Sequence, residues 1–157
     1  MTEYTIELIA VGCGVLFILL RITTTMKTRI WNLTETFPGK VNFIDSNNVI
    51  LGYDLGQSCC EHAFWTISEA PDGSNPIHKG DDEAIQEIEM DGYCFDPQFC
   101  ERESAGEDGG VAIFKLLGRQ YGTPKLPELF LRLENHHNGY YSHGFTFRGA
   151  VIIDGSL

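Results

Sequence analysis

The sequence predicts an α+β fold that is mainly antiparallel β, either a small sheet or sandwich or a barrel-like domain, with a hydrophobic helix at its N-terminus. Three observations support this class. Short runs of β-branched and aromatic residues alternate with turn-forming residues, 17 glycines are spread over 157 residues, and one apolar run stands near the N-terminus. Because the chain is short, we expect one β-rich domain over residues 26–157, behind a hydrophobic segment at 1–25.

The N-terminal segment is apolar from Leu8 to Leu20 and has basic residues on its C-terminal side. A membrane-spanning helix needs about 20 mostly apolar residues, a length that residues 6–25 approach. Two interpretations stay open: a single-span membrane anchor, or an upstream extension of a protein that starts at Met26. If the segment spans, its basic flank places the main domain inside. We therefore predict a cytoplasmic domain, either soluble or tethered to the membrane.

The main domain divides into short predicted strands joined by turns. Residues 40–53 predict a hairpin around the turn that begins at Asp45, because Asn and Asp bond the local backbone and tolerate positive φ. Residues 83–90 fit a helical face but lead into an extended stretch, so their state stays open. Further strands are predicted at 63–67, 111–117 and 151–153, with loops at 71–80, 106–110 and 121–127.

The C-terminal part has the clearest pattern, an alternation of leucine with other residues from Leu129 onward. The following Asn-Gly pair is a strong signal for a two-residue hairpin turn. Such a turn pairs Glu134 with His143 and His136 with Tyr141, so these four side chains are expected on one face. The side chains expected on the opposite face are Asn135, His137, Tyr140 and Ser142.

The charge of the chain indicates which classes of binding partner to expect. The net charge is -11, and the acidic excursion at 81–108 contains 11 acidic residues against Arg102 alone. We therefore expect no direct binding to nucleic acid, because such binding depends on Lys and Arg. One alternative is that the acidic stretch mimics nucleic acid and blocks a basic protein surface. The five cysteines are an odd number without a disulfide-type spacing, which favours a reducing compartment.

Two clusters of cysteine, histidine and glutamate are candidate metal ligands. They offer nitrogen and sulfur, which zinc prefers, although their spacing matches no established zinc motif. The alternative is that the cysteines pack in the core and the histidines flank an exposed loop. The candidate ligands are Cys60, His62, His136 and His143, with Glu61 or Glu134 as a candidate base.

The runs from Gly52 to His62 and from Asn138 to Phe145 resemble a family of small, uncharacterised bacterial and phage domains with a Gly-Tyr-Asp-x-x-Gln-x-Cys-Cys-Glu motif. The resemblance covers the chain from about Met26 onward. It implies no activity, because none is assigned to that family. It implies that both clusters belong to the common design of the domain, and it favours the upstream extension over the anchor.

We therefore expect a non-enzymatic binding or regulatory module with an unknown protein partner. The first alternative is a metal-binding domain, either purely binding or hydrolytic, with zinc as the cofactor. The second is the acidic mimic of nucleic acid.

Overall fold

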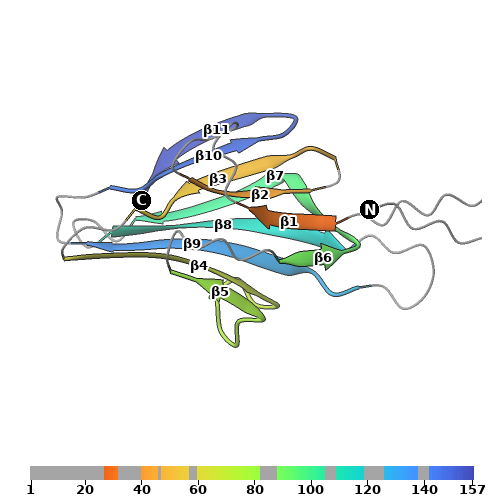
Figure 1. Ribbon diagram of the computed structural model, residues 1–157, viewed down its shortest axis with the longest axis horizontal. Helices are drawn as coiled ribbons and strands as arrows, with labels where there is room; N and C mark the ends of the chain where they lie inside the picture. Colours follow the sequence, from red (N-terminus) through yellow and green to blue (C-terminus); the bar gives the residue numbers. More distant parts are fainter. Residues whose placement is uncertain are drawn as a thin grey trace, which may run out of the picture.

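The computed structural model describes residues 27–31, 40–45, 47–56, 60–81, 88–104, 109–118, 126–137 and 142–157. These residues form eleven strands in two antiparallel sheets, which lie face to face as a β-sandwich (Figure 1). One hydrophobic cluster contains buried residues of both sheets. The two sheets therefore share one core.

The first sheet, sheet A, has the strand order β11-β10-β3-β2-β1-β6. Its strands are β1 (Lys27–Trp31), β2 (Lys40–Ile44), β3 (Ile50–Asp54), β6 (Glu89–Asp91), β10 (Gly144–Arg148) and β11 (Ile152–Ser156). The pairing of β3 with β10 sets Tyr53 opposite Phe145. Segments from the two ends of the described chain thus lie side by side.

The second sheet, sheet B, has the strand order β5-β4-β9-β8-β7. Its strands are β4 (Glu61–Ser68), β5 (His78–Gly80), β7 (Tyr93–Ser104), β8 (Gly109–Gly118) and β9 (Leu129–His137). Strand β9 pairs with β4 on one side and with β8 on the other. It is therefore a central strand with both edges bonded.

The core forms between the sheets because each sheet has one apolar face. On β9 every second residue is buried, and the three leucines of this strand are among them, as their alternation predicts. Aromatic rings of the two sheets pack against each other. The ring centroids of Phe43 and Trp65 are 5.3 Å apart, and those of Phe114 and Phe145 are 5.6 Å apart. Both pairs are edge to face, a favourable arrangement for aromatic rings.

The predicted N-terminal hairpin is confirmed by the antiparallel pairing of β2 with β3. In its turn Asn48 has φ 57°, a conformation that Asn tolerates. The Asp45 carboxylate is buried and accepts hydrogen bonds from the main-chain N–H groups of Asn47 and Val49. Its second oxygen accepts a bond of 2.9 Å from the N–H of Phe95 on β7. One carboxylate thus ties the hairpin turn to the opposite sheet.

Strand β7 forms one edge of sheet B and is interrupted by an irregularity between Phe95 and Cys100. The interrupted stretch contains Pro97. Proline has no main-chain N–H to donate to a neighbouring strand, so it is tolerated on an edge strand. After the irregularity Arg102 pairs with Ala112, whose side chain is buried in the core. The register therefore directs Arg102 toward the space between the sheets.

The hairpin predicted at the Asn-Gly turn is wrong. Strand β9 lies in sheet B and β10 in sheet A, so the two strands do not pair. Glu134 is opposite Phe64 and Val111 instead of His143. The reason is that β9 has leucines to bury and takes a central place in sheet B, which leaves no edge for β10. Residues 138–141, on which the turn itself was predicted, lie outside the described residues.

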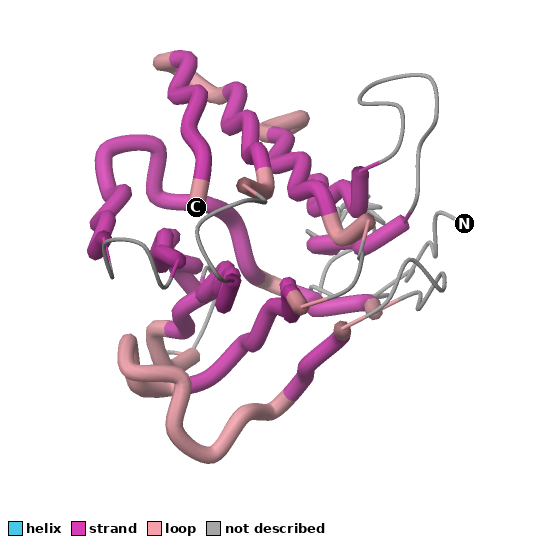
Figure 2. Tube along the Cα trace, turned by 90° about the vertical axis from the view of Figure 1, so that its left-hand side faces the viewer, coloured by secondary structure: helices cyan, strands magenta, loops and turns pink. Residues whose placement is uncertain are grey.

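The predicted α+β class is also wrong for the part of the chain described. All regular elements there are strands, and no part of the trace in Figure 2 is drawn as a helix. Of the residues at 83–90 whose state stayed open, the last two enter strand β6. No helix among the described residues is long and apolar enough to cross a membrane, so the described part gives no support to the predicted transmembrane helix. Residues 6–25, where that helix was expected, lie outside the described part.

Candidate functional site

Two of the four predicted metal ligands lie together on the outer face of sheet B. His62 on β4 is directly opposite His136 on β9. The ring of Phe64 stacks on both imidazoles, with centroids 5.0 Å from His62 and 5.7 Å from His136. The side chain of His136 is 61% exposed. These two histidines therefore belong to a solvent-facing aromatic patch.

The other two predicted ligands lie elsewhere. Cys60 is exposed and precedes β4 with φ 67°, whereas His143 is buried on the inner side of the sandwich. The structure therefore does not bring the four residues together. Within the part of the chain described, no three His, Cys, Asp or Glu side chains are grouped to hold a metal ion.

The two candidate bases are engaged in separate contacts. Glu134 accepts a hydrogen bond of 2.6 Å from Nε of Arg132, and its other oxygen lies 3.5 Å from Nε2 of His136. The prediction that Glu134 and His136 share a face is therefore confirmed. His143 does not join them, because it contacts Glu61 instead.

Glu61 and His143 form a pair that is closed to solvent, with side chains 2% and 4% exposed. Nδ1 of His143 lies 2.8 Å from the main-chain oxygen of Asp54, so this nitrogen carries a proton. Nε2 faces the Glu61 carboxylate at 3.3 Å. The pair links the start of β4 to the end of β3, and its burial suits a structural role.

Tyr53 makes another polar link between the two sheets. Its hydroxyl donates a hydrogen bond of 2.7 Å to the main-chain oxygen of Glu134, and its ring centroid lies 6.4 Å from that of His143. Burial raises the pKa of Tyr53 above its ordinary value, and the charges of Asp54 and Glu134 raise it further. The hydroxyl therefore stays a hydrogen-bond donor.

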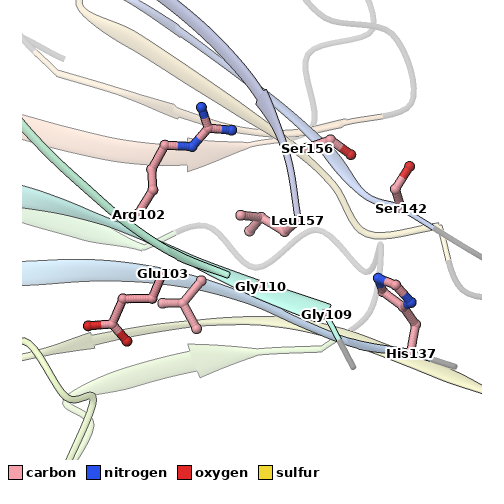
Figure 3. Close-up of a pocket in the computed structure, with 9 residues that line it drawn as sticks. Arg102, Glu103, Gly109, Gly110, His137, Ser142, Ser156 and Leu157 are labelled. Carbon is pink, nitrogen blue, oxygen red and sulfur yellow. The ribbon is translucent and has the colours of Figure 1, made fainter. Parts of the chain in front are cut away.

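A cavity of about 480 Å³ opens where β7 ends and β8 begins, beside the last residues of β11 (Figure 3). The side chains of Arg102 and His137 project from sheet B toward sheet A, whereas Glu103 points the opposite way. Elements of both sheets thus enclose the space. The lining residues are Arg102, Glu103, Gly109, Gly110, Val111, His137, Ser142, Ser156 and Leu157.

Arg102 holds its place in this wall through packing. Its guanidinium carbon lies 5.0 Å from the centroid of the Phe145 ring, a distance at which a cation is attracted to the ring face. Gly155 is opposite Phe145 in the sheet register, and a Cβ atom there would collide with both the guanidinium and the ring. The missing side chain therefore provides the room in which the guanidinium lies.

The rest of the wall is built from close main-chain contacts. The main-chain oxygen of Leu157 accepts hydrogen bonds from Nδ2 of Asn135 and from the N–H of His143, each 3.0 Å long. Gly109 has φ 120°, and a Cβ atom there would collide with the main-chain oxygen of Asn135. At Gly110 a Cβ atom would lie 3.3 Å from Cα of Leu157. The floor of the cavity is therefore closely packed main chain, and at Gly109 only glycine fits.

Sequence reasoning identified part of this wall. Strand parity placed His137 on the face opposite His136, which the structure confirms. Arg102 was visible only as the lone cation of the acidic stretch, and nothing in the local sequence connected it to Ser142 or Leu157. These residues meet only because β7, β9 and the end of the described chain converge.

Comparison of the chain with protein-family models, with curated proteins and with solved structures finds no match. The resemblance to the Cys-Cys-Glu domains therefore stays a prediction.

Proposed function

We propose that this protein is a binding module that holds a small molecule in the cavity between its two sheets. The observation that supports the proposal most directly is the cavity itself, because its volume of about 480 Å³ lies within the range of about 300 to 1,000 Å³ that is usual for small-molecule sites. The sequence predicts a binding or regulatory module without a site, and the proposal adds the location of the binding site and the kind of ligand.

The lining of the cavity supports capture of a ligand. A few polar groups, namely the Arg102 guanidinium, the His137 imidazole and nearby serines, surround a floor of main chain and the Leu157 residue. Such a mixture of few polar groups and fixed walls is typical of sites that orient a ligand. The buried His143, which contacts Glu61, is joined to Leu157 of the lining by main-chain hydrogen bonds of 3.0 Å.

The test is a fragment screen on the full chain, followed by ¹⁵N–¹H correlation spectra. We expect fragments that shift the amide signals of Gly109, Gly110 and Ser142 together, because these residues line one space. The His137→Trp variant should abolish these shifts by filling the cavity. The His136→Trp variant is the matched control, since its side chain lies on the outer face of the same strand.

A set of fragments that bind the wild type and the His137→Trp variant equally would contradict the proposal. So would binding that disappears in the control variant while that variant melts at the same temperature as the wild type. A screen in which no fragment moves the cavity signals would also overturn the proposal.

A further inference from the structure

The cavity contains a permanent positive charge that no described Asp or Glu side chain pairs with. Among the residues that the structure describes, no Asp or Glu forms an ion pair with Arg102. The neighbouring Glu103 side chain points to the other face of sheet B (Figure 3). The buried carboxylate at the start of β4, that of Glu61, contacts His143. No described Asp or Glu therefore competes with a ligand for the Arg102 guanidinium.

The guanidinium packs against the Phe145 ring before any ligand arrives. It lies over the Phe145 ring at 5.0 Å, in the space that Gly155 leaves open. A guanidinium presents its N–H groups as a planar fork, which matches the two oxygens of a carboxylate. Because a positioned side chain loses less conformational entropy on binding, this arrangement favours recognition of an anion at the wall.

The number of positive charges limits the charge of the ligand. Arg102 is the one Arg or Lys in the described lining of the cavity, and the whole chain has a net charge of -11. A monoanion is matched by one guanidinium, whereas a dianion would keep an uncompensated charge in a partly enclosed site. The overall negative field also disfavours multiply charged anions.

We propose that the cavity binds a small organic monocarboxylate, with its carboxylate on the Arg102 guanidinium and its apolar part against Leu157. This inference rests on the proposed function, since it assigns the ligand class of the same cavity. His137 stands in the wall of the same space.

The experiment is a calorimetric titration of the full chain with benzoate and hexanoate, and with the neutral benzamide and hexanamide as isosteres. We expect at least one carboxylate to bind at least tenfold more tightly than its amide, with affinity that falls as salt is added. The Arg102→Gln variant should lose at least tenfold in carboxylate affinity and leave amide affinity unchanged. Arg102→Lys should retain part of the affinity, because it keeps the charge but loses the fork.

The matched control is Arg132→Gln, which removes the same charge from the outer face of sheet B, where Arg132 pairs with Glu134. This variant should bind carboxylates as the wild type does. Thermal melts of all variants show whether the fold is kept, and the retained amide binding of Arg102→Gln reports on the cavity itself.

Equal affinity for carboxylate and amide, or an unchanged affinity in Arg102→Gln, would overturn the assignment of a monocarboxylate. Tighter binding of inorganic phosphate than of either carboxylate would overturn it in favour of a dianion. If neutral fragments bind in the cavity and carboxylates do not, this inference fails while the proposed function stands. If nothing binds there, both fail.

Discussion

The buried Asp45 carboxylate is the most informative position for testing how the two sheets are joined. It is 3% exposed and accepts three main-chain hydrogen bonds, two within its own turn and one across the core from Phe95. The substitution Asp45→Asn keeps the size of the side chain. It replaces one accepting oxygen by an NH₂ group, so the turn is retained while the bond across the core is lost.

The expected cost follows from the contact that is lost. A hydrogen bond to a charged group contributes about 1.5–3 kcal/mol, and a buried donor left without a partner costs a comparable amount. The lost hydrogen bond and the unpaired donor are two descriptions of the same Phe95 N–H group, so their costs are not added. We therefore expect a loss of about 3 kcal/mol in the free energy of unfolding. In a chain of this size each kcal/mol corresponds to roughly 2–4 °C in melting temperature.

The measurement is urea unfolding followed by tryptophan fluorescence, supported by a thermal melt. The matched control is Asp72→Asn, because Asp72 accepts the same kind of turn hydrogen bond from the N–H of Ser74 in an exposed loop. That variant should unfold at the wild-type urea concentration. If Asp45→Asn is as stable as the control, the carboxylate does not join the sheets and the reasoning is refuted.

Three further predictions concern other parts of the fold. Burial raises the pKa of Tyr53, so its contribution to stability is complete below the unfolded pKa of about 10 and is lost as pH rises above that value. The Tyr53→Phe variant should therefore show a smaller drop in urea midpoint between pH 8 and pH 11 than the wild type. An unchanged drop would contradict this. Gly109→Ala should prevent stable folding, judged by circular dichroism, because its φ is positive and a Cβ would strike the facing strand, whereas Gly144→Ala has room and should melt near the wild-type temperature. Iodoacetamide should modify exposed Cys60 before Cys100, whose thiol pKa is raised by burial; mass spectra showing the reverse order would argue against the described packing.

Local sequence patterns were sufficient for those features that depend on neighbouring residues alone. The hairpin of β2 and β3 was predictable because its turn residues favour positive φ and bond their own backbone. The alternation on β9 was predictable because side chains of a strand point to opposite faces in turn. For the same reason His136 and His137 were correctly separated before their surroundings were known.

Sheet membership could not be predicted, because a strand chooses its partners by burial over the whole fold. The Asn-Gly pair is a local signal for a hairpin, but β9 pairs on both edges within sheet B and β10 joins β3 in sheet A. His143 therefore meets Glu61 instead of Glu134. This change of partner removes His143 from the predicted metal cluster, and the positive φ of Cys60 separately takes that residue out of the extended strand.

The candidate ligand site shows most clearly which features follow from the local sequence and which require the tertiary structure. The sequence alone established an acidic chain with one arginine in its most acidic stretch, and strand parity separated the two faces on which neighbouring side chains lie. The tertiary structure set that arginine over Phe145, beside Gly155 and in the same cavity lining as His137. These contacts join residues more than 30 positions apart, and they form because two apolar sheet faces pack together and leave a gap at their edge.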